Sequence, residues 1–180
     1  MRKLNQIGVV ERRPPRGTYM RAWTEKDRAE ILHLLDALIL LSVELSVGYL
    51  TEETFAQLEQ IIADTRATAP GMIDNQFQTE RDANFHLIIA RASGSRRLVE
   101  FMEQLMLPLQ LYSKESDEYF QPDFWLRIHS GLLEALRTGD LDTAVACSLR
   151  NSRESRAVLL RKSITDGRSQ LVYSKQQAEG

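Results

Sequence analysis

The sequence has one cysteine, Cys147, and three histidines, His33, His86 and His129, in 180 residues. A single cysteine excludes an internal disulfide framework and is typical of proteins kept in a reducing compartment, so we expect a cytoplasmic location. Nucleophile–base pairs are also lacking, because Cys147 has no histidine near it along the chain and Ser148 has no obvious activating partner. We therefore do not expect an enzyme.

Long uninterrupted apolar runs are lacking as well. The most apolar stretch, 31–50, is interrupted by His33, Asp36 and Glu44. A helix that spans a bilayer needs about 20 mostly apolar residues with few or no charges. The segment is therefore predicted to be a central helix of a bundle, and no membrane partner is expected. The first three residues lead into mixed polar sequence rather than an apolar core, so no secretory signal is expected either.

The composition is that of a globular chain with an uneven charge distribution. Apolar residues make up 43% and charged residues 27%, which is enough apolar sequence for one well-packed domain and too much for a disordered one. The net charge is −2, but residues 1–21 hold six basic side chains against one acid, a charge of +5, so the remainder carries −7. This basic arm has two interpretations, a segment that meets a polyanion or a solvated terminus.

Two patterns divide the chain. Two short β-prone runs within 9–21 surround Pro14 and Pro15, which predicts a small hairpin with a basic tip. From Thr24 onward, apolar residues recur at helical spacing between capping and breaking signals. The predicted helices begin at Thr24 and Thr51 and then cover about 73–93, 95–118, 122–138 and 141–163. We expect an all-α fold, an antiparallel bundle of six or more helices with an N-terminal β-hairpin, and a fraying polar tail over 164–180.

A candidate site follows from the scarce histidines. The segment "RDANFHLIIA" sets Asp82 and His86 four residues apart, on one face of a predicted helix and beside its apolar side. The segment "FWLRIHSGLLEAL" places His129 next to the core stripe of another helix. Three such groups on two helices can form a metal site of the inward-facing kind, whereas Asp82 and His86 alone would be a structural pair. The D-x-x-x-H spacing is unspecific, so both interpretations stay open.

Three stretches follow one another between residues 4 and 152: "LNQIGVVERRPPRGTYM", "DANFHLIIARASGSRRL" and "IHSGLLEALRTGDLDTAVACSLRNS". The first resembles the end of the winged domain of GntR-family transcriptional regulators. The second and third resemble the D-x-x-F-H…A-x-G-N-x-x-L and H-x-x-(I/L)-x-x-A-(I/L)-x-x-G-D patterns of the FadR-type subgroup, with Ser95 in place of the usual Asn. That subgroup joins a winged helix-turn-helix to an all-helical effector-binding domain, the FCD domain.

The resemblance implies a division of the chain and a partner for each part. Residues 1–23 correspond to the tail of the recognition helix and the wing, and 24–163 to the effector-binding domain of a cytoplasmic homodimer. The wing would contact DNA phosphates through its basic tip, namely Arg12, Arg13, Arg16 and Gly17. Because the family reads bases with helices that precede the wing, we expect weak, salt-sensitive DNA binding by the chain as given. A truncated regulator that no longer binds DNA itself is one alternative.

The resemblance also implies a ligand set. In the subgroup, one Asp and three His hold a divalent metal, and these positions fall on Asp82, His86, His129 and Asn151. Asn151 stands where the family usually has His, and an amide oxygen binds Zn²⁺ or Ni²⁺ less well than imidazole does. Asn151 is therefore expected to contact a small organic acid effector, and Ser155 either joins it or bonds back to its own helix. Because Asp–His–His also suits non-haem iron, a metal-dependent enzyme is the other alternative.

Overall fold

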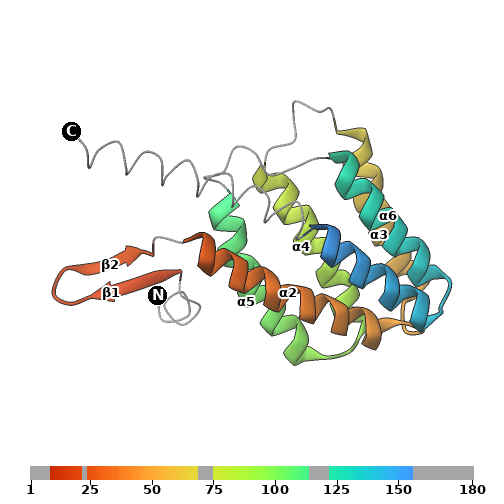
Figure 1. Cartoon of the computed structure of the whole chain (residues 1–180), viewed down its shortest axis with the longest axis horizontal. Coiled ribbons are helices and arrows are strands. Elements are labelled where there is room, and N and C mark those ends of the chain that lie inside the picture. Colours follow the sequence, from red (N-terminus) through yellow and green to blue (C-terminus); the bar gives the residue numbers. More distant parts are fainter. Residues whose placement is uncertain (1–8, 22–23, 69–74, 114–121, 156–180) are drawn as a thin grey trace, which may run out of the picture.

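The computed structural model describes residues 9–21, 24–68, 75–113 and 122–155. A hairpin comes first, formed by β1 (Val10–Arg13) and β2 (Gly17–Met20), which pair antiparallel. Gly17 has φ 108°, a backbone conformation that glycine adopts without strain. The predicted hairpin is thus confirmed, and it projects away from the helical body (Figure 1).

The body is helical, as predicted. It consists of α2 (Glu25–Ser46), α3 (Glu52–Ala67), α4 (Asn75–Ala92), α5 (Arg96–Ser113), α6 (Pro122–Arg137) and a further helical segment over 141–155. These six helices pack together, so the predicted all-α bundle is confirmed for the described ranges. The predicted continuations over 114–118 and 156–163, and the predicted tail 164–180, lie outside the described residues.

Capping side chains explain where two of the helices begin. The hydroxyl of Thr24 accepts from the backbone N–H of Asp27, and the Asp27 carboxylate accepts in return from the backbone N–H of Thr24. This reciprocal capping box satisfies two backbone donors at the start of α2. Thr51 accepts from the backbone N–H of Thr54 in the same way at the start of α3.

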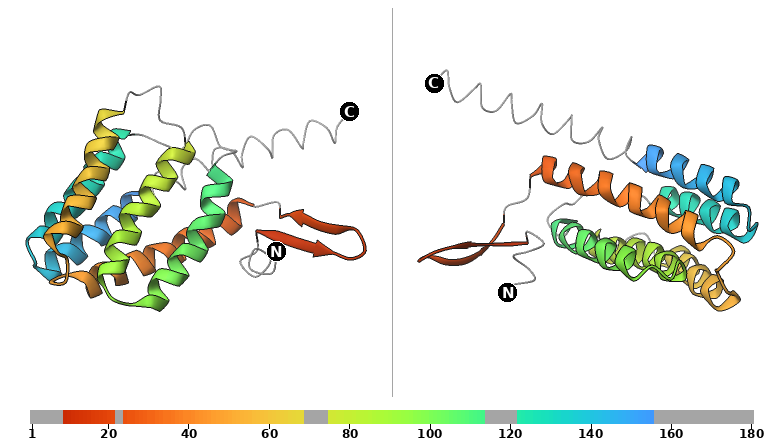
Figure 2. Two further views of the ribbon diagram at one scale, coloured as in Figure 1. Left: turned by 180° about the vertical axis from the view of Figure 1, so that it is seen from behind. Right: turned by 90° about the horizontal axis from the view of Figure 1, so that it is seen from below.

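Two apolar clusters meet at α4. One cluster joins α2, α3, α4, α6 and the segment 141–155, and includes Val43, Leu58, Phe85, Ile89, Trp125, Leu132 and Cys147. The other joins α2, α4 and α5, and includes Ile31, Leu35, Leu87, Met102 and Met106. Neighbouring residues of α4 therefore pack against different clusters, and the left view of Figure 2 shows this helix between α3 and α5. His86, a polar residue of α4, is buried between these clusters, whereas Asn84 and Arg91 of the same helix are exposed.

The apolar α2 is a bundle helix whose buried face contributes to both clusters. Among the described residues, none of the helices combines the length and apolarity that crossing a membrane requires.

Candidate metal centre

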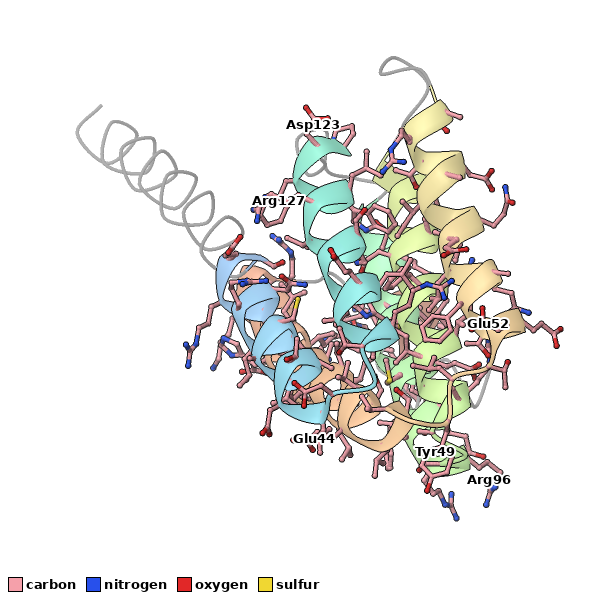
Figure 3. The ribbon with its side chains drawn as sticks, turned by 90° about the vertical axis from the view of Figure 1, so that its right-hand side faces the viewer. Glu44, Tyr49, Glu52, Arg96, Asp123 and Arg127 are labelled. Carbon is pink, nitrogen blue, oxygen red and sulfur yellow. The ribbon has the colours of Figure 1, made fainter. Side chains whose placement is uncertain are left out.

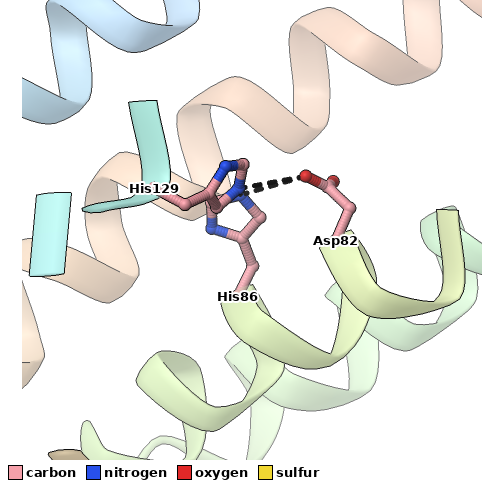
Figure 4. Close-up of side chains that lie close together, drawn as sticks. All are labelled: Asp82, His86 and His129. Atoms are coloured by element: carbon pink, nitrogen blue, oxygen red, sulfur yellow. Dashed lines mark hydrogen bonds and ion pairs between the residues drawn. The ribbon is translucent and has the colours of Figure 1, made fainter. Parts of the chain in front are cut away.

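Asp82, His86 and His129 come together in the space between α4 and α6. The Nε2 atom of His129 lies 3.1 Å from Asp82 Oδ1 and 3.3 Å from His86 Nε2. His86 Nε2 lies 3.9 Å from the same Asp82 oxygen. Figure 4 shows the two imidazoles and the carboxylate pointing toward one another from these helices. The structure thus brings together the three groups that the sequence patterns singled out.

The tautomer of His129 is fixed by its own helix. Its Nδ1 lies 2.9 Å from the backbone carbonyl oxygen of Trp125, one turn earlier on α6. A carbonyl can only accept, so Nδ1 carries a proton, and Nε2 is the ring nitrogen directed toward Asp82 and His86. The whole residue is 2% exposed, and its ring stacks on the Trp125 indole with centroids 4.0 Å apart. A histidine held by such a second contact is arranged as metal-binding histidines are.

Asp82 is ionised in this environment. Burial by itself would raise the pKa of Asp82, but the hydrogen bond from His129, the two nearby imidazoles and the Trp125 N–H outweigh it and hold the pKa well below its usual range. The indole Nε1 of Trp125 donates to Asp82 Oδ1 over 2.9 Å. The Asp82 side chain is 43% exposed, against 10% for His86 and 3% for His129, so the carboxylate forms the solvent-facing edge of the group.

His86 is a neutral imidazole at physiological pH. Burial lowers the pKa of His86 to about 4, with a further lowering from His129, although Asp82 opposes the shift. Its Nδ1 is buried and has no hydrogen-bond partner among the described residues. Neutral imidazole is the form that binds metals, so both the charge state and the direction of Nε2 suit a metal ligand.

The spacing of the three donor atoms fits a divalent ion. Zinc bonds to nitrogen and oxygen of ~2.0–2.2 Å place neighbouring ligand atoms roughly 3–3.5 Å apart. Two of the observed separations, 3.1 and 3.3 Å, fall in that range, and the third is 3.9 Å. Three lone pairs that face one another repel unless a cation, either a proton or a metal ion, lies between them. The arrangement can therefore hold a metal ion through one carboxylate oxygen and two imidazoles.

Asn151 contacts α6 through its amide nitrogen, which binds the backbone. Its Nδ2 donates over 2.8 Å to the carbonyl oxygen of Ile128, the residue before His129. The same nitrogen lies 3.9 Å from Cys147 Sγ. Asn151 is thus held against α6 and is not one of the three grouped donors. Ser155, one turn further along the segment 141–155, is partly buried.

The predicted DNA-contacting residues lie in the hairpin. Arg13, Arg16 and Gly17 are exposed at and beside the turn, whereas the side chain of Arg12 lies outside the described part. Arg13 forms an ion pair with Glu11 on its own strand. The Tyr19 hydroxyl donates to the Arg16 carbonyl oxygen over 2.6 Å, which ties the turn to β2.

Trp125 is the residue of this site that the sequence patterns did not single out. The spacing placed it on the core stripe of α6, where it indeed lies, at 4% exposure. It also contacts both Asp82 and His129. A buried indole N–H usually finds an acceptor, and that general rule was the only available signal.

Solved structures of transcriptional regulators share this fold. With McbR/YncC of E. coli the TM-score is 0.69 at 20% identity, over 89% of this chain and 77% of that chain. A GntR regulator from Rhodococcus sp. RHA1 matches with a TM-score of 0.68 at 16% identity, which covers 88% of this chain and 76% of that chain. A GntR family member from Pseudomonas syringae pv. tomato matches with a TM-score of 0.60 at 16% identity, which covers 89% of this chain and 67% of that chain. No curated protein was found that matches the chain.

A family model adds evidence that does not depend on fold likeness. The FCD domain model matches residues 24–152, from the cap of α2 to the segment that carries Asn151. This match confirms the predicted resemblance and indicates the effector-binding domain of a transcription regulator rather than an enzyme. The chain belongs to the FCD domain family.

Proposed function

We propose that the chain is the effector-sensing part of a GntR/FadR-type DNA-binding regulator, and that it binds a small carboxylate metabolite through a divalent metal held by Asp82, His86 and His129. The observation that carries the proposal is the convergence of one carboxylate oxygen and two imidazole nitrogens, with their closest contact at 3.1 Å. The low pKa of Asp82 and the depressed pKa of His86 support it, because both groups are already in their ligand forms.

The proposed effector class follows from the number of protein ligands. Zn²⁺ takes four or more ligands and Ni²⁺ accepts more, so three protein donors leave positions for water or an added ligand. A carboxylate oxygen suits such a position and is attracted by the ion's charge. Asn151 takes the place of a fourth protein ligand, and its amide nitrogen donates to the carbonyl oxygen of Ile128. An incoming acid could therefore reach the ion directly.

The test separates metal binding from effector binding. The metal content of the purified chain is measured, and the metal-free chain is titrated with Ni²⁺ and Zn²⁺ by calorimetry. Thermal shifts are then recorded with a series of small mono-, di- and tricarboxylic acids, with and without metal. The proposal expects tight metal binding and an acid-dependent stabilisation that requires the metal. Stabilisation by an acid without metal, or no metal binding at all, would contradict it.

The proposal includes a second copy of the chain as a partner. Along α2, Leu34, Leu41 and Leu45 are 55%, 39% and 41% exposed, and the partly buried Leu38 completes the row. The spacing of these four leucines is four, three and four residues, which reads the same in both directions. A two-fold axis pairs a patch with itself, so such a row suits two antiparallel α2 helices.

The placement of a hydrogen-bond donor and an acceptor favours the same pairing. Exposed His33 and Glu44 lie eleven residues apart, which is about three helical turns, so they share one flank of α2. Glu44 is drawn on the surface of the molecule in Figure 3. When Leu34 faces Leu45 of the partner subunit, His33 comes close to Glu44 of the partner subunit, and the symmetry repeats the contact. The occupant we propose for this leucine row is therefore another copy of the same helix.

A further inference from the structure

One tryptophan contacts two of the three metal-ligand candidates, and these lie on different helices. The Trp125 indole N–H donates to Asp82 on α4 over 2.9 Å, while its ring stacks on His129 of α6 at an interplanar angle of 18°. Its backbone carbonyl also accepts the proton on Nδ1 of His129. A single residue thus restrains the carboxylate, the imidazole plane and the imidazole tautomer.

We infer that Trp125 is a positioning residue that makes Asp82 bind the metal through one oxygen only. The inference rests on the proposed metal site. The oxygen that accepts from the indole, Oδ1, is also the one 3.1 Å from His129 Nε2 and 3.9 Å from His86 Nε2. A carboxylate oxygen has two lone pairs, so the indole occupies one and leaves the other for the ion. Turning the carboxylate to present both oxygens would break the indole bond.

Packing by itself does not account for the hydrogen bond from Trp125 to Asp82. A second aromatic residue, Phe85, packs against the same rings and forms no such bond. Phe85 is fully buried and packs edge-on against His86, His129 and Trp125, with ring centroids 5.7, 4.8 and 6.0 Å away. Phe85 packs against these three rings, but its side chain has no N–H group and donates no hydrogen bond to Asp82 or to either histidine. Trp125 and Phe85 therefore form a matched pair in which only one member contacts Asp82 through an N–H group.

The experiment compares the wild type with Trp125→Phe and Phe85→Leu, with Co²⁺ as the probe. Trp125→Phe keeps an aromatic ring beside His129 but removes the N–H donor together with part of the ring volume, and Phe85→Leu serves as the control for lost volume. It should weaken Co²⁺ binding by about tenfold or more, as loss of such an outer contact does, and change the visible spectrum of the bound ion. Phe85→Leu should lower the melting temperature but leave that spectrum unchanged.

The outcomes separate this inference from the proposed function. If the wild type binds no Co²⁺, the metal site itself is wrong. If the wild type binds it and Trp125→Phe keeps the same affinity and spectrum, or Phe85→Leu changes the spectrum equally, Trp125 does not position Asp82. A second measurement requires no change at Trp125: with Trp23→Phe, the indole N–H resonance belongs to Trp125 alone. It should shift when Zn²⁺ binds, and an unmoved resonance in the loaded protein would overturn the inference.

Discussion

At the scale of single residues, the site depends on groups whose charge differs between the folded and the unfolded chain. The pKa of His86 is lowered to about 4 in the fold, mainly by burial, from an ordinary value near ~6.5. Between these two values the unfolded chain binds the proton more readily than the folded chain does. The folded state therefore loses stability as the pH falls through this window. Asp82 acts in the same direction at lower pH, since its pKa in the fold is also lowered.

We accordingly predict that the metal-free chain becomes less stable on acidification, by on the order of 2 kcal/mol between about pH 7 and pH 4.5. Urea unfolding at several pH values measures this. The matched variant His86→Gln lacks the titrating group and should show a flatter dependence over the same range. A wild-type stability that rises as the pH falls would contradict the sign.

A second prediction at this scale concerns the ligands themselves. His129→Ala should abolish binding of Ni²⁺ and Zn²⁺, because it removes the Nε2 atom that lies close to both other donors. Asn151→His should tighten binding on the order of tenfold, about 1.4 kcal/mol, by adding a good fourth ligand. Calorimetric titration of the metal-free variants measures both. His33→Ala is the control, because His33 is exposed on α2 and should leave the affinity unchanged.

The role of Trp125 shows what could not be predicted for the site. Helical spacing put Asp82 and His86 on one face and His129 beside the core stripe of another helix. The resemblance implied that the three share a site, and the structure brings them together. The indole bond to Asp82 joins residues 43 positions apart and depends on how α6 is rotated against α4. No local pattern in the sequence records that rotation. The same holds for Asn151, whose amide turns its nitrogen to the backbone of α6.

At the scale of helices and strands, local rules predicted most of the structure. Thr24 and Thr51 act as the caps that their sequence contexts indicated. The helix predicted over 73–93 runs from Asn75 to Ala92, and the one predicted over 122–138 from Pro122 to Arg137. Gly94 and Gly139, with φ of 69° and 68°, follow these two helices in the conformation that commonly ends a helix. The assignment of each α4 face to a different cluster depends on tertiary packing and was not predictable from spacing.

The capping box gives a prediction at this scale. Thr24→Ala should lower the free energy of unfolding by about 1 kcal/mol, because it removes the hydroxyl that satisfies the Asp27 N–H. Chemical denaturation followed by circular dichroism measures the change. Thr18→Ala is the control: this threonine is exposed on β2, and its loss should change stability by less than about 0.5 kcal/mol. Equal effects of the two substitutions would mean that the cap contributes nothing specific.

At the scale of the whole molecule, the exposed leucine row of α2 predicts self-association. Leu41→Glu places a charge near the middle of the proposed two-fold contact and should convert a dimer into a monomer at micromolar concentration. Analytical ultracentrifugation measures the mass, and circular dichroism checks that the helices are retained. Leu149→Glu is the control, since Leu149 has the same exposure, 39%, on the segment 141–155. A wild-type chain that stays monomeric would rule out this surface as the dimer contact.

The hairpin predicts a salt-dependent contact with DNA. Binding by the chain should be weak, should show little sequence preference and should fall as salt rises, because it depends on phosphate contacts. Each of Arg13→Ala and Arg16→Ala should reduce the slope of log affinity against log salt by about 1. Fluorescence anisotropy with two unrelated duplexes measures this. Arg150→Ala, on an exposed position of the body, should leave the slope unchanged. Tight binding to only one duplex would contradict the expectation.

The uneven exposure of the three donors has a consequence for rates. Asp82 is 43% exposed, whereas the histidines are almost enclosed. In the proposed centre, an arriving ion meets the carboxylate first and a departing ion leaves it last. The speed of exchange would then be governed mainly by Asp82, and the choice between metals mainly by the two enclosed imidazoles. How long an ion stays and which ion is accepted would therefore depend on different residues, and a substitution could alter one without the other.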